Sequence, residues 1–411
     1  MVRKLILFLE MHQPRRLRYG VLDKLCDLRR GEVDEPTINS IIFNDEVNRE
    51  ILNRVADKSY MPTLELMRDL GNDGFRAAIS ISGSLIDQLL MWRPEVIDLL
   101  RDLVRRGGIV ELVAEPYHHS LASFVSGGDL FLRELEDHVE TNKSLFGQVP
   151  LVFENTEFLY RNDWGGLLME KAGASVVLTE GGVDWVLGWR SPTYLYGAPN
   201  SRVRLLLRHY RLSDDIGFRF SNRSWDQWPL TADKYMAWIR ATPPGDFVLV
   251  GLDFETFGEH HWRESGIFDF LAWLPKEARR ADVEFIHPSS LANEEPIDYL
   301  DIPSVISWAD VEKDDSAWRG NDLQRIAFDH VISIGNLMKM NRLEKTWRYL
   351  LTSDHYYYMS MKHGPSGEVH SYFNPYNSAF TAFKAVEDIV VGITCALANT
   401  GINRAVGHGV E

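Results

Sequence analysis

Short apolar runs recur along the chain as far as Phe285, and the segments between them carry helical patterning. The runs have the length of buried strands, so we predict strands at 5–10, 77–82, 109–114, 151–153, 175–178, 204–207 and 247–252. Linking segments such as 95–104 and 130–143 carry apolar residues at helical spacing. Repeated strand-then-helix units are typical of a parallel α/β barrel or of an open doubly wound sheet, and periodicity does not choose between them.

Polar residues lie at or just past the carboxyl ends of several predicted strands. They are His12, Glu111, Glu115, Glu157 and Asp253. In a parallel barrel the carboxyl ends of the strands meet on one face, where active sites lie. Each residue alone would be interpreted as a cap or turn residue, but five together favour a barrel with a site at its mouth.

The pattern changes after Phe285. Three prolines punctuate a segment of little periodicity, which we interpret as a linker or an excursion: Pro288, Pro296 and Pro303. Farther on, two apolar stripes recur at helical spacing, and each predicts a long helix. The first stripe comprises Leu323, Ile326, Ala327, Val331, Ile334, Leu337 and Met338, and the second comprises Phe380, Phe383, Val386, Ile389, Val390 and Ile393. We therefore expect a helical domain packed against the barrel.

Charge and length narrow the class of protein. The 411 residues are enough for a large catalytic core with an appendage. With 59 acidic and 44 basic residues the net charge is −15, which argues against nucleic acid as a partner, because a polyanion requires a basic surface. An acidic surface suits a neutral substrate such as a sugar.

The start of the chain and the number of cysteines each argue against certain classes of protein. The apolar run after Arg3 and Lys4 ends at Leu9, which is too short for a signal peptide or a membrane span. We therefore expect a cytoplasmic protein with no membrane partner. The two cysteines, Cys26 and Cys395, are too few for a disulfide framework or a four-cysteine zinc site.

Two stretches combine carboxylates with aromatic residues. Glu154 and Glu157 lie in ENTEF, whereas Asp253, Glu255 and Glu259 lie in GLDFETFGEHHW, after a different predicted strand. Most glycosidic bonds are cleaved by two carboxyl groups that flank the scissile oxygen, one ionised and one protonated. Sugar rings stack on aromatic side chains, and the chain has 12 Trp and 15 Tyr residues. These stretches are candidates for glycosidic cleavage.

Metal chemistry is the main competing interpretation, because the chain has 13 histidines, with adjacent pairs at 118–119 and 260–261. Zinc sites on helices usually place two histidines four residues apart, and no two histidines here are three or four residues apart. Adjacent residues diverge on a helix and point to opposite faces of a strand. We therefore expect no catalytic metal and no cofactor. The lack of a G-x-S-x-G elbow argues against a Ser-His-Asp hydrolase.

Five stretches in sequence order resemble the motifs of glycoside hydrolase family 57, in particular its α-amylase branch. They are MHQP at 11–14, VELVAEPYHHSL at 110–121, FENTEFLY at 153–160, GLDFETFGEHHW at 251–262 and SWADVEKDDSAWRGN at 307–321. Two further similar stretches, TSDHYYYMSMK at 352–362 and YFNPYNS at 372–378, extend the resemblance into the helical region. The resemblance thus covers nearly the whole chain.

The resemblance implies a fold and a catalytic pair. The fold is a (β/α)7 barrel, a distorted relative of the (β/α)8 barrel, followed by a helical domain. We place the catalytic barrel at residues 1–290 and the helical domain, which completes the substrate cleft, at residues 291–411. Glu157, the glutamate of the third motif, is the implied nucleophile, and Asp253, which begins DFETFGEH, is the implied general acid/base.

The resemblance also implies substrate-binding roles for several other residues, namely His12, Glu111, His119 and Asp310, with Trp308 and Trp318 near the path of the glucan. A hydrogen-bonded histidine at a strand end is the alternative for His12, and core packing is the alternative for both tryptophans. Glu255 lies two residues after Asp253. It is a further candidate for substrate binding, and for the acid if Asp253 is not.

Two positions depart from the family pattern. Glu154 stands where the resemblance leads us to expect arginine, and His118 stands where we expect tyrosine. Residues three apart in a strand face opposite sides, so Glu154 need not lie beside Glu157. If it did, the like charge would raise one of the two pKa values. The departures put the substrate preference in doubt but leave the carboxylate pair intact.

The expected activity is therefore retaining, α-amylase-like cleavage of α-1,4-glucosidic bonds in an α-glucan or maltooligosaccharide. A 4-α-glucanotransferase or a branching enzyme is the nearest alternative, because a sugar hydroxyl can capture the same covalent intermediate in place of water. A catalytically silent, glycan-binding protein is a second alternative, although such proteins typically lose one carboxylate. A metal-dependent polysaccharide deacetylase is the third, and it needs a histidine spacing that the chain lacks.

Overall fold

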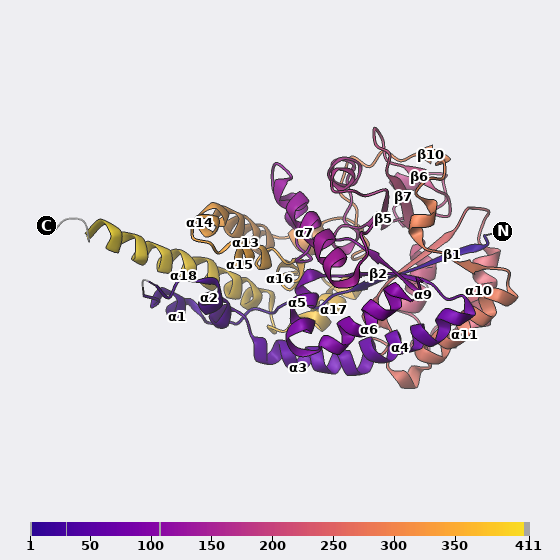
Figure 1. The fold of residues 1–411 in the computed structure, drawn as a ribbon, viewed down its shortest axis with the longest axis horizontal. Helices are drawn as coiled ribbons and strands as arrows, with labels where there is room; N and C mark the ends of the chain where they lie inside the picture. Colours follow the sequence, from indigo (N-terminus) through magenta and orange to yellow (C-terminus); the bar gives the residue numbers. More distant parts are fainter. Residues whose placement is uncertain (1, 30, 107, 407–411) are drawn as a thin grey trace.

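Seven parallel strands form a ring that is nearly closed into a barrel at the centre of the protein. The computed structural model describes residues 2–29, 31–106 and 108–406 (Figure 1). Around the ring the strands are β1 (Lys4–Met11), β2 (Ala77–Ile81), β3 (Val110–Val113), β4 (Val152–Phe153), β5 (Val176–Glu180), β7 (Arg204–Arg208) and β8 (Val248–Asp253), which returns to β1. A bridge between Ala114 and Phe153 links β3 to β4. The expected (β/α)7 barrel is confirmed.

Each of the seven predicted strands has its counterpart in the ring, with ends displaced by no more than two residues. The reason is that both faces of these strands are covered, so the sequence runs apolar without alternation. In β1, for instance, every residue from Leu5 to Met11 is buried. Three small strands lie outside the ring: β6 (Tyr196–Gly197), β9 (Glu284–Phe285) and β10 (Asp298–Tyr299).

Helices between the strands cover the outside of the ring. They are α3 (Asp45–Val55), α4 (Met61–Leu70), α5 (Gly83–Trp92), α6 (Pro94–Arg105), α7 (Asp129–Phe146), α8 (Asp184–Leu187), α9 (Tyr210–Gly217), α10 (Ala232–Ala241) and α11 (Ile267–Arg280). In α6, Val96, Ile97, Leu100 and Leu103 are buried at three- and four-residue spacing, and Pro94 opens the first turn.

The region after the barrel is helical, with one difference from expectation. It contains α12 (Ser316–Arg319), α13 (Asp322–Ser333), α14 (Gly335–Met340), α15 (Glu344–Tyr349), α16 (Ser353–Tyr357), α17 (Gly364–Phe373) and α18 (Ala379–Val406). The first apolar stripe was expected in a single helix, but it is divided between α13 and α14. The break falls at Gly335, where a Cβ would lie 2.5 Å from the Trp347 ring, so the chain passes close to that side chain.

The helical region also takes in segments from the start of the chain. α1 (Leu22–Cys26) and α2 (Glu35–Ile42) lie beside α18 and α15 (Figure 1), and a disulfide joins Cys26 to Cys395 of α18. A domain boundary near residue 290 stays a prediction. None of the described helices combines the length and the apolar content that a membrane span requires.

Candidate active site

A cavity of about 740 Å³ opens at the carboxyl ends of the barrel strands, and the helical region supplies part of its wall. Eight of the nine predicted site residues line it: His12, His119, Glu157, Asp253, Glu255, Trp308, Asp310 and Trp318. They come from segments that are far apart in the sequence. The convergence expected at the mouth of a parallel barrel is therefore present.

Glu111 is the predicted site residue that the structure does not bring to this cavity. It is the second residue of β3, so it lies toward the amino end of the strand. Its carboxylate accepts a hydrogen bond from the Ser289 amide at 3.2 Å and lies 4.0 Å from His287. Its position in the strand places the side chain away from the mouth, and the expected substrate contact for Glu111 stays a prediction without support from this geometry.

Glu157 lies in the turn that follows β4, with a backbone φ of 57° in the left-handed region. This conformation costs energy for a residue with a side chain and persists only where the surroundings enforce it. The Trp308 indole N–H donates to Glu157 Oε2, and His119 Nε2 lies 3.6 Å from Oε1. The side chain retains 28% exposure, so the carboxylate is oriented by two partners but still faces the cavity.

Asp253 ends β8 and faces the same cavity. Its side chain is 47% exposed and forms part of the cavity wall. Burial, followed by the charge of Glu157, raises the pKa of Asp253 to about 7. The site therefore contains one carboxyl group that holds a proton near neutrality and a second one oriented by an indole and an imidazole.

Glu255 lies deeper in the wall than Asp253. It is 5% exposed, and the Tyr60 hydroxyl donates to Glu255 Oε1. Burial raises the pKa of Glu255 to about 8. Because Asp253 is the more exposed of the two and its pKa responds to Glu157, Asp253 is the better candidate for the acid.

His12 and His119 stack on each other, with ring centroids 3.9 Å apart. Both nitrogens of His12 have protein partners, since Nδ1 lies 2.6 Å from Ser82 Oγ and Nε2 lies 2.9 Å from Asp354 Oδ2. Burial lowers the pKa of His12, and the neighbouring His119 adds to this effect. These contacts match the alternative interpretation of His12 as a hydrogen-bonded histidine at a strand end. Its ring also packs against the ring of His119.

Glu154, the first departure from the family pattern, is influenced by the other acidic side chains of the site. It is fully buried, and its pKa is raised well above the usual value by burial and by the charges of Glu115, Glu157 and Asp253. Glu154 directly follows β4, and its amide still donates to the Ala114 carbonyl at 2.8 Å. The charge of Glu157 is therefore one of the like charges that raise the pKa of Glu154.

The three predicted residues of the fifth motif differ in what they contact. Trp308 packs on Phe158 and donates to Glu157, so it orients the candidate nucleophile. Trp318 is fully buried, which favours core packing over a sugar platform. Asp310 Oδ2 is held by Lys362 Nζ at 2.7 Å and by His370 Nε2 at 2.9 Å.

His118, the second departure, faces away from the cavity. Its ring Nδ1 lies 2.9 Å from Glu134 Oε1, and Arg348 of α15 also donates to Glu134. Although burial raises the pKa of Glu134, the charges of His118 and Arg348 lower it to about 2. This buried ion pair connects the barrel to the helical region.

Sequence reasoning missed several charged residues in the cavity wall, and Arg208 and Asp354 are two of them. Arg208 ends β7, pairs with Glu180 at 3.0 Å and with Asp214 at 2.7 Å, and lies over the Trp308 ring. Asp354 of α16 holds His12. Arg208 could have been found, because it follows an apolar strand as the recognised residues do. Asp354 could not, because its position depends on how α16 packs.

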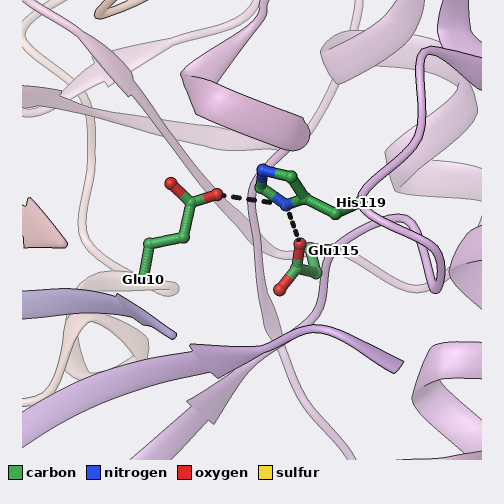
Figure 2. A group of neighbouring side chains, drawn as sticks. All are labelled: Glu10, Glu115 and His119. Carbon is green, nitrogen blue, oxygen red and sulfur yellow. Dashed lines mark hydrogen bonds and ion pairs between the residues drawn. The ribbon is translucent and has the colours of Figure 1, made fainter. Parts of the chain in front are cut away.

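One cluster has ligands suited to a metal ion. Figure 2 shows the carboxylates of Glu10 and Glu115 directed at the same ring nitrogen of His119. Nδ1 lies 3.5 Å from Glu10 Oε1 and 2.7 Å from Glu115 Oε2. The expectation of no metal considers only pairs of histidines, whereas this cluster combines one histidine with two glutamates.

Comparison with known proteins identifies the family. The sequence model of glycosyl hydrolase family 57 matches residues 6–303, which include both candidate carboxylates. The chain belongs to glycosyl hydrolase family 57. A protein of Methanocaldococcus jannaschii, provisionally named an alpha-amylase, is 41% identical over 397 residues, or 93% of this chain and 82% of that protein. The predicted resemblance is confirmed.

Two solved structures share the fold of this family 57 chain. The branching enzyme of Pyrococcus horikoshii has a TM-score of 0.64 at 14% identity and covers 90% of this chain and 87% of its own. The 4-alpha-glucanotransferase of Thermococcus litoralis has a TM-score of 0.58 at 16% identity and covers 85% of this chain. The chain covers 48% of that enzyme, and at these identities the likeness shows the fold alone.

Replacement of Trp308 by Phe should slow glycoside cleavage, because it removes the N–H that orients Glu157 and keeps an aromatic ring. Hydrogen bonds to charged groups are worth about 1.5–3 kcal/mol, so we expect kcat to fall by about ten- to a hundredfold. Steady-state kinetics measures the effect. Trp164→Phe, a buried tryptophan outside the cavity, is the matched control for loss of ring volume. An equal loss of kcat in both variants would contradict an orienting role.

Proposed function

We propose that the protein is a retaining glycoside hydrolase of the α-amylase type that cleaves α-1,4-glucosidic bonds in α-glucans or maltooligosaccharides. The observation that carries the proposal is the pair of carboxyl groups in one cavity, where the charge of Glu157 helps to raise the pKa of Asp253 to about 7. One group is thus suited to attack and the other to donate a proton. The relative provisionally named an alpha-amylase supports the substrate class.

In the first step, a Glu157 carboxylate oxygen bonds to the anomeric carbon while the bond to the glycosidic oxygen breaks. Asp253 transfers its proton to that oxygen, and the shortened chain leaves with a free hydroxyl group. The Trp308 N–H and the neighbouring His119 ring fix the attacking carboxylate, and the left-handed backbone at Glu157 keeps it directed at the cavity.

In the second step, Asp253 is ionised and removes a proton from a water molecule. The water oxygen bonds to the anomeric carbon, and the bond to Glu157 breaks, which restores both carboxyl groups. As the charge on Glu157 is consumed in the intermediate, its effect on Asp253 disappears and the pKa of Asp253 falls. Asp253 therefore changes from an acid to a base when the mechanism requires it.

The variants Glu157→Gln and Asp253→Asn should fold normally and lose nearly all activity. Each keeps the shape of the side chain but removes the negative charge or the titratable proton. A catalytic acid or base typically contributes about 10²–10⁴-fold, so either rate should fall by at least a hundredfold on maltooligosaccharides. Circular dichroism and thermal unfolding serve as controls for folding. Retention of more than about a tenth of the wild-type rate would remove that residue from the catalytic pair.

The activity should decline in alkaline solution. Asp253 must be protonated when the bond breaks, and its pKa is raised to about 7, so the active form is present below this pH and is lost as the pH rises through it. The logarithm of kcat/KM should fall with a slope of about one per pH unit above this value. Unfolding measured at each pH excludes a stability effect. A rate that stays constant while Asp253 loses its proton would assign the acid elsewhere.

Product analysis separates hydrolysis from transfer and tests the stereochemistry. Two successive inversions retain the starting configuration, so early NMR spectra should show α-configured reducing ends. Shorter maltooligosaccharides alone indicate hydrolysis, and longer ones in addition indicate a 4-α-glucanotransferase. New α-1,6 branch signals would indicate a branching enzyme. An initial β-product would overturn the nucleophile role of Glu157, and the lack of any product would favour a glycan-binding protein.

A further inference from the structure

The cluster behind Glu157 gathers more negative charge than the protein balances. Glu10, Glu115 and Glu154 are each no more than 3% exposed, and their carboxyl groups influence one another. His119 contacts the first two and is the cationic group nearest to them among the described contacts. Ionised carboxylates in the interior are stable only with counter-charge and hydrogen bonds, and one imidazolium balances one of three.

Several oxygen atoms of this cluster have no hydrogen-bond partner among the described residues. They are both carboxylate oxygens of Glu154 and Oε1 of Glu115. The Ser80 hydroxyl lowers the pKa of Glu154, but it does not reach hydrogen-bonding geometry with either oxygen. Glu154 is fully buried, and the strongest charge effect on it comes from Glu115, so Glu154 adds a further acidic group to the surroundings of this cluster. Buried carboxylates without partners indicate a missing ligand.

We propose that Glu10, Glu115 and His119 bind one divalent transition-metal ion of the Zn²⁺ or Mn²⁺ type. A water molecule would supply hydrogen bonds but no positive charge, whereas a divalent cation supplies both ligand bonds and charge. Nδ1 of His119, Glu10 and Glu115 each offer a ligand atom, all within 4.8 Å of one another. An imidazole nitrogen among carboxylate oxygens suits Zn²⁺ or Mn²⁺ better than Ca²⁺ or Mg²⁺.

The ion would act as a positioning group for the candidate nucleophile. A metal on Nδ1 fixes the proton of His119 on Nε2, the nitrogen that lies 3.6 Å from Glu157 Oε1. The ion would also neutralise the carboxylates that lie behind Glu157. This inference is independent of the proposed reaction, since it concerns binding of the metal alone.

Metal titration tests the site directly. The full-length protein is freed of metal with a chelator, exchanged into chelator-free buffer and titrated with Zn²⁺ by calorimetry and with Mn²⁺ by electron paramagnetic resonance. We expect about one equivalent of tight binding and a higher melting temperature in the presence of metal. Pulsed EPR of the Mn²⁺ complex should show coupling to an imidazole nitrogen. Failure to bind one equivalent of either ion overturns the proposal.

Single substitutions locate the bound ion. Glu115→Gln, Glu10→Gln and His119→Gln should each weaken binding by at least about tenfold, because each removes either the negative charge of a carboxylate ligand or the imidazole nitrogen. Glu111→Gln is the matched control: it changes a buried glutamate near His287, outside the cavity, and should leave the affinity unchanged. Circular dichroism confirms folding of each variant. Equal affinity in wild type and all three ligand variants overturns the site, as does an equal loss in the control.

Discussion

The His119 ring is the contact on which the arrangement of the barrel mouth depends. It meets Glu115, Glu10 and Glu157 at 2.7, 3.5 and 3.6 Å. Glu10 lies in β1, whereas Glu115 and Glu157 follow β3 and β4. Burial lowers the pKa of His119, but these carboxylates outweigh burial and raise it well above the usual value. Carboxylates of one sign are costly in a dry interior without a positive partner, and the imidazole supplies positive charge where the ends of these strands meet.

The helical region helps to hold the His119 ring in position from outside the barrel. Ser353 of α16 donates its amide to the His119 carbonyl at 3.0 Å, which helps to hold that residue at a φ of 50°. Its neighbour Asp354 holds His12, on which the His119 ring stacks. Trp308, from the segment before α12, fixes Glu157. The candidate catalytic carboxylates therefore have barrel positions, but residues beyond the barrel determine how one of them is oriented.

The sequence predicted the strands well because burial on both faces leaves an apolar run that is easily recognised. It predicted less where the outcome depends on tertiary packing. Glu154 and Glu157 both follow a two-residue strand, and no pattern marks so early an end. The division of the α13–α14 stripe at Gly335 depends on the approach of Trp347. The prediction of Glu157 and Asp253 as the catalytic pair rests on the family motifs. Carboxylates that follow strands are too common for the strand pattern alone to select two of them.

The glutamate at position 154 changes the electrostatics of the site more than its chemistry. The family resemblance leads us to expect arginine at position 154. With arginine there, the buried glutamates would have a counter-charge within their own group. Glutamate at this place replaces a positive charge by a negative one, a difference of two charges in the same buried volume. Burial raises the pKa of both Glu10 and Glu154, and the charges of Glu115 and Glu157 add to this effect, so the group must take up protons or a cation. Whether the group takes up protons or a cation, Glu157 and Asp253 stay in place. Glutamate at position 154 therefore changes the charges around the candidate nucleophile and keeps the two groups that react.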